Sequence, residues 1–371
     1  AAAAAAASSA PLPGERGVLQ HLLDVMIPDE EVVITISHAG YIKRTSLSEY
    51  RKQGRGGVGQ KGVNTRDQDF IEHVFVATNH NYLLFFTEWG RCYWLRVYEV
   101  PEGSKASKGR AIQNLINIPQ DDKLRAFINT KDLRDEEYVN SNYIVMVTQK
   151  GVIKKTTLEA YSRPRSNGIN AITVREGDML LEAKLTTGND DILMAVRSGK
   201  AIRFNENAVR AMGRNASGVR GVSLANDTDE VVGMVTIPED LQEATSILVV
   251  SEHGYGKRSQ LDDYRITNRG GKGVKTITVS DKTGDLVAIK AVSDEDDLMV
   301  INKSGIMIRI GVSDLRVMGR ATQGVRLINL KKNDTIASVA KVPAGDEEED
   351  VEFDENAGEA PETKGEAPAE D

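Results

Sequence analysis

The chain has 371 residues, with 47 Lys and Arg, 55 Asp and Glu, 33 Gly and a single cysteine, Cys92. One cysteine excludes an intrachain disulfide framework and a multi-cysteine zinc site, and no apolar run is long enough for a membrane-spanning helix. The net charge of −8 is unevenly distributed, because residues 346–371 carry 13 acidic side chains and one basic side chain. The tail therefore carries −12 and residues 1–345 carry +4, a distribution that favours a polyanionic partner.

The two ends of the chain are predicted to lie outside the folded body. Ala1–Ala7 lacks the basic start and apolar core of a signal peptide, and we interpret this run as artefactual. Residues 15–26 place apolar side chains at helical spacing, which predicts a short lead-in helix before Pro28. We therefore expect a lead-in or linker over residues 1–28, a folded body over 29–344 and a disordered acidic tail over 345–371.

Six repeats of one pattern fill the folded body. Each repeat has an apolar run, a polar turn with a glycine and a second strand-like run, and successive turn glycines are 48 to 61 residues apart. This pattern is typical of a β-hairpin that turns at a glycine with positive φ. A period near 50 residues predicts an all-β, six-bladed propeller-like fold with four strands in each blade. The turn glycines are Gly40, Gly90, Gly151, Gly199, Gly254 and Gly305.

Two further positions of the repeat are fixed relative to the turn glycine. A second glycine follows after 19 residues in five units and after 17 in the third, at Gly59, Gly109, Gly168, Gly218, Gly273 and Gly324. An apolar residue stands ten residues after each turn glycine, at Tyr50, Val100, Tyr161, Val209, Tyr264 and Leu315. We expect these apolar side chains to form part of the blade core.

Basic residues also recur at two positions. Four residues after the turn glycine stand Arg44, Trp94, Lys155, Arg203, Arg258 and Arg309, and shortly before the second glycine stand Arg55, Lys105, Arg165, Arg214, Arg269 and Arg320. Equivalent positions of repeating units occupy equivalent places, so a closed ring of blades would carry these residues as a belt of positive charge. A generic solvated rim is the alternative interpretation of the same pattern.

One glycine-rich segment identifies a family. Residues 53–59 read QGRGGVG, and this segment resembles the signature heptapeptide of the C-terminal domain of DNA gyrase A, which runs Gln, basic, Arg, Gly, Gly, basic, Gly. Five positions match, whereas Gly54 and Val58 replace the two basic residues. Residues 267–273 (TNRGGKG) resemble a second copy that keeps Arg269 and Lys272. With the six repeats, the resemblance extends over about residues 29–344.

The resemblance implies a β-pinwheel, a propeller-like disc whose blades exchange strands with their neighbours. Such a domain is expected to bind duplex DNA around its outer edge without sequence preference, bend it and wrap it with positive handedness. In the whole gyrase, this wrapping supports ATP-dependent negative supercoiling. Arg and Lys on a curved face suit this task, because phosphates provide the contacts and no base needs to be read.

The resemblance also implies what other parts of the enzyme supply. The DNA-breaking tyrosine belongs to the N-terminal breakage-reunion part of gyrase A, and ATP binds gyrase B. This chain is therefore expected to hold no catalytic residue, no metal and no cofactor of its own, since ATP and Mg are used by the holoenzyme. Its expected partners are duplex DNA, the N-terminal part of gyrase A and the gyrase B protein. We expect a monomeric isolated domain in the bacterial cytoplasm, near the nucleoid and not at a membrane.

The residues that we expect to contact DNA either belong to one of the two glycine-rich boxes or have a basic side chain near one of the repeat positions. They are Lys43, Arg44, Arg51, Lys52, Gln53, Arg55, Gly56, Gly57, Gly59, Lys61, Arg91, Arg96, Lys105, Lys108, Arg110, Lys154, Lys155, Arg163, Arg165, Arg203, Arg214, Arg220, Lys257, Arg258, Arg269, Gly270, Gly271, Lys272, Arg309, Arg320 and Arg326.

Other functions remain as alternatives. The corresponding domain of topoisomerase IV shares the expected fold, and a propeller that scaffolds protein partners would instead have an acidic or aromatic central funnel. An enzyme is disfavoured because no nucleophile and base are paired in the sequence. The acidic tail is interpreted either as an intramolecular competitor of DNA for the basic belt or as a solubilising appendage.

Overall fold

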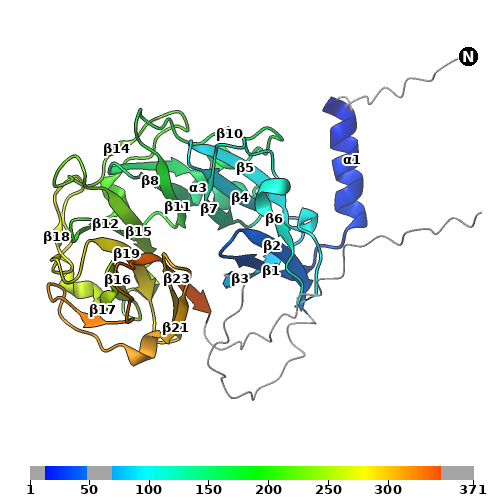
Figure 1. Ribbon diagram of the computed structural model, residues 1–371. Helices are drawn as coiled ribbons and strands as arrows, with labels where there is room; N and C mark the ends of the chain where they lie inside the picture. The colour runs from blue at the N-terminus through cyan, green and yellow to red at the C-terminus, as the bar shows by residue number, and fades with distance from the viewer. Residues whose placement is uncertain (1–12, 48–68, 105, 344–371) are drawn as a thin grey trace, which may run out of the picture.

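The computed structural model describes residues 13–47, 69–104 and 106–343 (Figure 1). Within these ranges, no helix is long and apolar enough to cross a membrane. The interpretations of Ala1–Ala7 and of the acidic tail fall outside these ranges. So do the predicted DNA contacts of the first glycine-rich box and its surroundings, namely Arg51, Lys52, Gln53, Arg55, Gly56, Gly57, Gly59, Lys61 and Lys105.

Each of the six repeats forms a β-hairpin at the predicted turn glycine, and each hairpin is the centre of one sheet, or blade. The turn glycines have φ between +86° and +96°, which explains why glycine stands there. The first strands of the hairpins are β1 (Glu31–Ser37), β4 (Tyr82–Thr87), β8 (Tyr143–Thr148), β12 (Asp191–Val196), β16 (Ser246–Ser251) and β20 (Asp296–Asn302). The second strands are β2 (Tyr41–Ser46), β5 (Arg91–Arg96), β9 (Val152–Thr157), β13 (Lys200–Asn205), β17 (Tyr255–Gln260) and β21 (Met307–Gly311).

A third strand of the same repeat pairs with the first strand of each hairpin and lies on the inner side of the blade. Five of the six junctions between neighbouring inner strands make clear contacts, including the junction between β23 and β3, so the last blade meets the first. Figure 1 shows the resulting ring around a common centre. The inner strands are β3 (Ile71–Thr78), β7 (Leu124–Asn129), β11 (Leu180–Thr186), β15 (Val231–Ile237), β19 (Leu286–Val292) and β23 (Ile336–Pro343).

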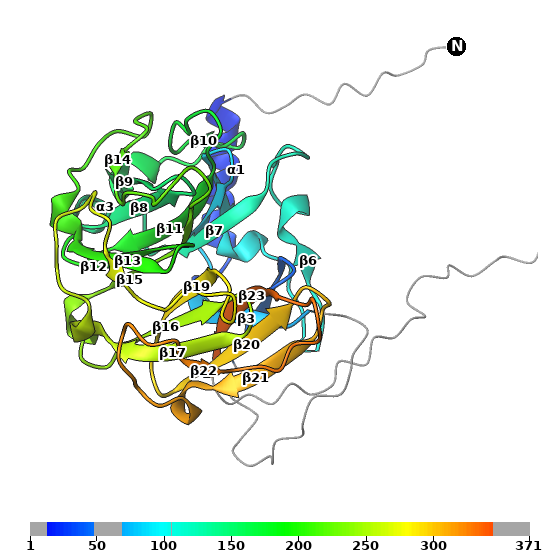
Figure 2. The same ribbon diagram turned by 60° about the vertical axis from the view of Figure 1, so that its left-hand side comes forward.

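A two-residue strand from the following repeat forms the outer edge of each of the first five blades, and we call it the exchanged strand. Each begins directly after a predicted second glycine and pairs with the second hairpin strand of the preceding blade. Figure 2 brings the fifth blade forward, where β22 pairs with β17. The sixth sheet has three strands within the described ranges, in the order β21-β20-β23. The exchanged strands are β6 (Arg110–Ala111), β10 (Ile169–Asn170), β14 (Val219–Arg220), β18 (Val274–Lys275) and β22 (Val325–Arg326).

The second glycines allow this exchange because they lie against the backbone of the preceding blade. A Cβ atom at Gly218 would stand 2.5 Å from the carbonyl oxygen of Ile153, and Gly218 has φ of +101°. The equivalent glycines from the second to the sixth unit also have positive φ and the same close approach. Their role in this structure is therefore to let one unit cross onto the next.

A repeated aspartate fixes most of the hairpin turns. Asp69 accepts the backbone N–H of Ala39 at 2.8 Å, and Asp178 accepts that of Lys150 at 2.9 Å. Asp122 and Asp229 make the equivalent bonds in the second and fourth blades. Each carboxylate also accepts the N–H of the residue that follows it, so it joins the turn to the start of the inner strand.

The apolar core lies between neighbouring blades rather than within one of them. One cluster joins Phe86 of the second blade to Ile144 and Tyr161 of the third, and comparable clusters fill the other junctions. At the junction of the first and last blades, Phe70 packs with Ala340 and Val342. The apolar positions ten residues after the turn glycine are buried from Val100 to Leu315, as predicted, whereas Tyr50 lies outside the described ranges.

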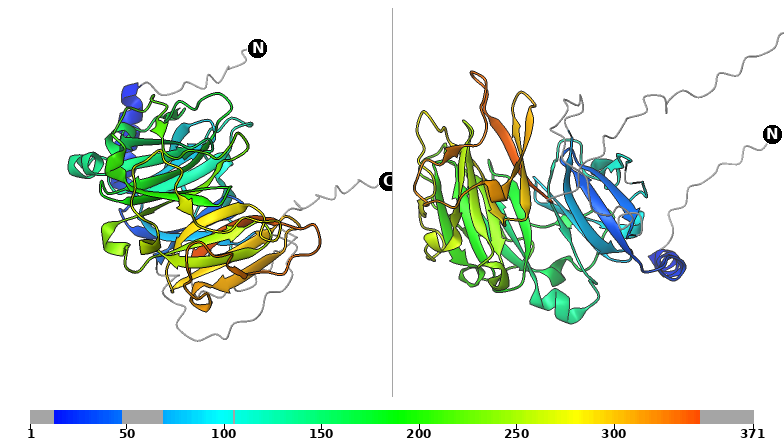
Figure 3. Two further views of the ribbon diagram at one scale, coloured as in Figure 1. Left: turned by 90° about the vertical axis from the view of Figure 1, so that its left-hand side faces the viewer. Right: turned by 90° about the horizontal axis from the view of Figure 1, so that it is seen from below.

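Helices contribute little to the fold. The predicted lead-in helix is α1 (Pro13–Met26), which lies outside the ring beside the first blade (Figure 3). The short α3 (Glu136–Ser141) is capped by Asp135, whose side chain accepts two backbone N–H groups. Single 3₁₀ turns follow most second strands or connect units, namely η1 (Val97–Glu99), η2 (Ile112–Asn114), η3 (Leu158–Tyr161), η4 (Glu206–Ala208), η5 (Glu239–Leu241), η6 (Leu261–Asp263) and η7 (Val312–Asp314).

Candidate nucleic-acid interface

In the first five units, the side chain four residues after the turn glycine bonds to the next unit. Arg44 Nε donates to the carbonyl of Val100 at 3.1 Å, and Arg258 Nε donates to that of Leu315 at 2.6 Å. Trp94 Nε1 makes the corresponding bond to Tyr161 at 2.9 Å. In each case the acceptor is the apolar residue ten positions after the next turn glycine. The property that this position requires is therefore a side-chain N–H donor, and a positive charge is not needed for the bond.

Acidic partners neutralise most of these buried cations. Arg203 donates twice to Asp191 Oδ2, at 2.8 and 2.6 Å, and Lys155 lies 3.3 Å from Glu206. Arg258 pairs with Asp294 at 2.6 Å, and the more exposed Arg309 pairs with Asp297 at 2.7 Å. These contacts join neighbouring strands and units, so they stabilise the ring and do not form a belt of free charge.

A second group of predicted DNA contacts is buried one position earlier in the repeat. Lys43 Nζ donates to the carbonyl of Ser107 at 2.7 Å, and Lys257 Nζ donates to those of Gly319 and Thr322 at 2.8 and 2.9 Å. Lys154 Nζ donates to the carbonyls of Ala171 and Arg214. Each ammonium thus holds the loop that the next unit sends toward its exchanged strand.

Burial changes the acid–base behaviour of two of these lysines. Desolvation, with a smaller repulsion from Arg214, lowers the pKa of Lys154 to about 7. Desolvation and the nearby Arg320 lower the pKa of Lys257 to about 8. Both groups therefore release their protons in the folded protein well below the pH at which an exposed lysine does.

These observations correct the predicted interface. Six of the predicted DNA-contacting side chains are buried, with their charged ends bonded to protein groups, because the repeat uses them to connect units. They are left out of the interface proposed below, and they are Lys43, Lys154, Lys155, Arg203, Lys257 and Arg258.

The bases ahead of the second glycine lie closer to the outer edge. Arg214 Nη1 donates to the carbonyl of Asn170 at 2.9 Å, and Arg269 Nη1 donates to that of Arg220 at 3.0 Å. Arg320 donates to the carbonyl of Lys275 in the same way. These three half-buried guanidinium groups therefore hold the last residue of the preceding unit's exchanged strand, and each has five N–H donors in total. Arg165, from the third unit, is exposed.

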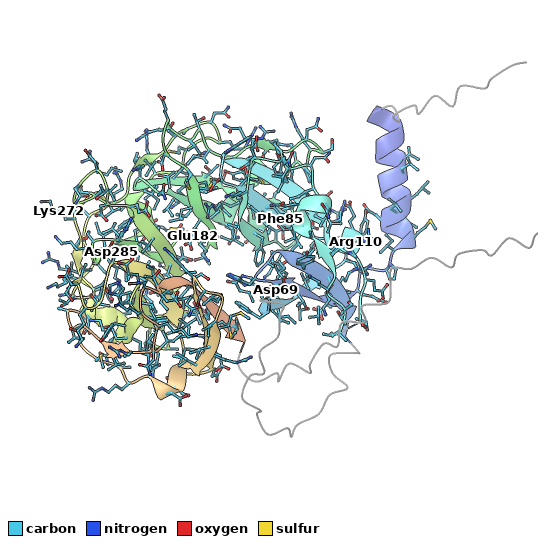
Figure 4. The ribbon with its side chains drawn as sticks, in the orientation of Figure 1. Asp69, Phe85, Arg110, Glu182, Lys272 and Asp285 are labelled. Carbon is cyan, nitrogen blue, oxygen red and sulfur yellow. The ribbon has the colours of Figure 1, made fainter. Side chains whose placement is uncertain are left out.

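Fully exposed cations lie on and beside the exchanged strands. Arg110, Arg220 and Arg326 belong to β6, β14 and β22, at the outer edges of three blades. Figure 4 shows Arg110 and Lys272 on opposite outer sides of the ring, whereas Glu182 lies toward its centre. Arg326 donates to the Tyr255 hydroxyl at 2.9 Å, and the ammonium of Lys108 lies 4.2 Å from the centre of the Tyr41 ring. These contacts orient the side chains while they keep their charge.

The remaining predicted residues have protein partners. Arg91 donates to the Asn167 carbonyl at 3.1 Å, and exposed Arg163 pairs with Glu159 at 2.7 Å. Arg96 is half-buried against the Tyr82 ring, with its guanidinium carbon 4.4 Å from the ring centre.

The glycines of the second glycine-rich box, Gly270 and Gly271, bond to the preceding unit through their backbone groups. The N–H of Gly270 donates to the Gly221 carbonyl at 2.7 Å and is therefore already satisfied. The carbonyls of Gly270 and Gly271 both accept bonds from Ser223. In this structure, these glycines hold the fifth unit against the fourth.

Sequence reasoning missed several exposed cations at the rim. Arg210, Arg265 and Arg316 stand eleven residues after their turn glycines, and the same position is basic in the first unit. Lys275 ends β18, and Lys200 begins the neighbouring β13. The position eleven residues after the turn glycine was a detectable signal in the sequence. It was overlooked because the two other basic positions were more regular.

The described ranges contain no group of three or more His, Cys, Asp or Glu side chains that could hold a metal ion. Cys92 is buried, and burial raises the pKa of its thiol well above the ordinary value. Neither observation adds a chemical group to the described part of the rim.

A ring of blades that exchange outer strands and present cations along the outer edge defines a β-pinwheel. Comparison with known proteins agrees with this class. The family described as "DNA gyrase C-terminal domain, beta-propeller" matches residues 31–78, 81–131, 142–187, 190–238, 245–293 and 296–343, one segment for each unit. The chain belongs to this family.

Similar proteins of greater length are DNA gyrase A proteins. The chain is 44% identical over 332 residues to the DNA gyrase A protein of Staphylococcus epidermidis, covering 89% of this chain and 36% of the relative. It is 43% identical over 334 residues to the DNA gyrase A protein of Staphylococcus aureus, with the same coverage. The chain thus spans about a third of the length of these relatives.

Two solved structures resemble the fold. The C-terminal domain of DNA topoisomerase IV superposes with a TM-score of 0.73 at 25% identity, covering 87% of this chain and 96% of that one. A DNA gyrase A C-terminal domain superposes with a TM-score of 0.62 at 26% identity, covering 84% of this chain and all of that one.

Proposed function

We propose that this domain binds duplex DNA without sequence preference around its outer edge, bends it and wraps it. The observation that carries this proposal is the exposed Arg or Lys on four of the five exchanged strands, at the outermost position of the blades. Arg210, Arg265 and Arg316 are further exposed cations of the fourth, fifth and sixth units. Cations that recur on successive units suit the regular line of phosphates on a duplex, which needs no base readout.

The energy of bending requires many such contacts. A body of about 315 residues has an outer radius near ~25 Å, so the axis of wrapped DNA would run at roughly 35 Å. Bending DNA by 180° on that radius costs on the order of 13 kcal/mol. About ten phosphate contacts with counterion release can offset this cost, whereas one or two cannot. The exposed cations on the exchanged strands of the first, third, fourth and fifth blades can supply part of this number.

We further propose that the domain serves a whole DNA gyrase in ATP-dependent negative supercoiling. In that enzyme its partners are the N-terminal breakage-reunion part of gyrase A and the gyrase B protein. Those parts supply the DNA-breaking tyrosine and use ATP and Mg, while this domain contributes no catalytic residue and no cofactor. We place it in the bacterial cytoplasm and take the isolated domain to be a monomer.

The topology of a bound DNA circle tests the wrapping proposal. Relaxed circular DNA is incubated with the domain, treated with a nicking-closing enzyme, and its linking number is measured after the protein is removed. A positive shift that grows with the amount of protein is expected. Binding without a shift would contradict chiral wrapping, and absence of binding would contradict the proposal as a whole.

The salt dependence of affinity tests the phosphate contacts. The logarithm of the binding constant should fall linearly with the logarithm of the salt concentration, with a slope of about −0.9 for each phosphate contacted. About ten contacts predict a slope near −9, and a flat response would exclude binding dominated by phosphates.

A domain of topoisomerase IV is the second candidate, because the similarity to the topoisomerase IV structure has the higher TM-score of the two. The identity of 44% to a DNA gyrase A protein favours gyrase. Reconstitution with the N-terminal part of gyrase A and with gyrase B distinguishes the two. Negative supercoiling of relaxed DNA that is lost without this domain supports gyrase. Decatenation or relaxation without supercoiling supports topoisomerase IV.

A further inference from the structure

The outer edge of the fourth blade places two lysines directly opposite each other. The exchanged strand β18 pairs with β13 through only two residue pairs, Lys200 with Lys275 and Ala201 with Val274. Residues directly opposite in an antiparallel pair have Cβ atoms about 4.5–5.5 Å apart on the same face of the sheet. Both lysines are exposed, and neither side chain has a hydrogen bond or ion pair with a described residue. Like charges in this arrangement weaken the strand pairing.

The other exchanged strands avoid this arrangement. Opposite Arg110 stands Ile42, and opposite Arg220 stands Val152. Opposite Arg326 stands Tyr255, whose hydroxyl accepts a hydrogen bond from it. In the second blade Asn170 faces Arg91. Within the described part of the ring, the fourth blade alone joins two units through a pair of facing cations.

Further cations lie beside one member of this pair, Lys275. A surface hollow of about 470 Å³ is lined by Asp263, Arg265, Val274, Lys275 and Arg320. Arg320 donates through Nε to the Asp263 carbonyl at 3.0 Å and also to the Lys275 carbonyl. This fixes its guanidinium beside β18. The hollow thus has three cationic side chains against one carboxylate, a suitable environment for a phosphate group.

We propose that this place is a phosphodiester-binding site of the domain, in which one backbone phosphate of duplex DNA bridges Lys200 and Lys275, with Arg265 and Arg320 on the side of Lys275. The inference rests on the proposed function, because it assumes that the domain binds duplex DNA. An anion between the two ammonium groups replaces their repulsion by two attractions. Bound DNA therefore strengthens the pairing of β18 with β13 and stiffens the connection between the fourth and fifth units.

The proposal predicts opposite effects on stability and on binding. Lys200→Gln and Lys275→Gln remove the repulsion, so each should raise the Tm of the free domain by about 1–2 °C at low salt. The double variant should bind duplex DNA about three- to tenfold more weakly at about 50 mM salt, with a salt slope smaller by about one. Lys200→Arg with Lys275→Arg keeps both charges and should keep the affinity.

Matched controls separate the local site from general charge. Lys131→Gln with Lys150→Gln removes the same charge from two exposed lysines in connections away from the exchanged strands. This control should lower affinity less than twofold and leave Tm unchanged. Amide hydrogen exchange gives a second readout, since DNA should slow exchange of residues 274–276 more than that of the equivalent residues 325–327.

The results distinguish the failure of this site from the failure of the proposed function. If the unmodified domain does not bind duplex DNA, the proposed function itself is contradicted. If it binds, but the Lys200 and Lys275 variants have the affinity and slope of the control, the phosphate bridge is contradicted. A loss of Tm in those variants would also overturn it, because the lysines would then be stabilising the free protein. Higher Tm with weaker binding supports it.

Discussion

Side-chain N–H donors on the second hairpin strands connect each unit to the next. Trp94 stands at the position that is Arg or Lys in the other units, yet its indole makes the same bond to the next unit. Because a buried donor and a buried carbonyl satisfy each other there, the position is constrained by the fold whether or not the domain meets DNA.

Arg203 and Arg210 provide a direct test of this distinction. Arg203→Met leaves the buried carboxylate of Asp191 without its ion-pair partner and should lower the free energy of unfolding by about 3–5 kcal/mol. Arg210→Met removes an exposed charge seven residues later and should change stability by less than about 0.5 kcal/mol while weakening DNA binding. Denaturant unfolding measures the stability of both variants, and a binding titration measures their affinity for DNA. Equal stability of the two variants would contradict the structural role of Arg203.

Lys154 makes the stability of the domain depend on pH. Its pKa falls from 10.5 to about 7 on folding, so between pH 7 and about 10 the unfolded chain binds more protons at this group than the folded protein does. Stability contributed by this group therefore rises with pH across that window, by at most about 1.4 kcal/mol per pH unit. The neutral amine retains two N–H donors for its two carbonyl acceptors.

Comparison with Lys154→Met isolates this effect. The difference in unfolding free energy between the unmodified domain and the variant should increase from about pH 7 to about pH 9 and be constant below about pH 6. Denaturant titrations at each pH measure it. A constant difference over the whole range would show that this lysine keeps an ordinary pKa.

At the scale of the structural element, the exchanged strands depend on the glycines that precede them. Gly273 and Gly177 have nearly the same φ, +77° and +73°, but only Gly273 lies against another strand. Gly177→Ala should therefore cost about 1–2 kcal/mol for backbone strain alone. Gly273→Ala adds a collision with the Ala201 carbonyl and should cost several kcal/mol more. Thermal unfolding compares them, and similar losses would mean that close approach is unimportant.

The elements themselves were predictable because their causes are local. Glycine spacing and the apolar run before each glycine turn predicted the six hairpins, and the apolar residue ten positions after the turn glycine predicted part of the core. Whether each cation is buried or exposed was not predictable. Lys154 is buried and Arg220 is exposed because of their contacts with other units. Whether a lysine faces solvent or a carbonyl depends on the register between units, which one repeat does not encode. The repeated aspartates that cap the turns were overlooked because their spacing varies.

For the whole molecule, the acidic tail provides a further prediction. If residues 346–371 compete with DNA for the rim, their deletion should tighten DNA binding at low salt, and the gain should shrink as salt screens the tail. Affinities at about 25, 100 and 300 mM salt, with and without the tail, measure this. Equal affinities at the lowest salt would instead favour a solubilising role.

Each unit pairs its exchanged strand with the preceding blade, and this pairing determines how the ring can gain or lose chain. Every described donation uses the same two-residue pairing, so removal or duplication of one complete repeat would bring matching edges together again. A deletion that ends inside a repeat would instead leave one blade without its outer strand and one exchanged strand without a blade to pair with. Whole repeats are therefore the natural increments by which this architecture can gain or lose circumference, and with it the length of duplex that it can accommodate.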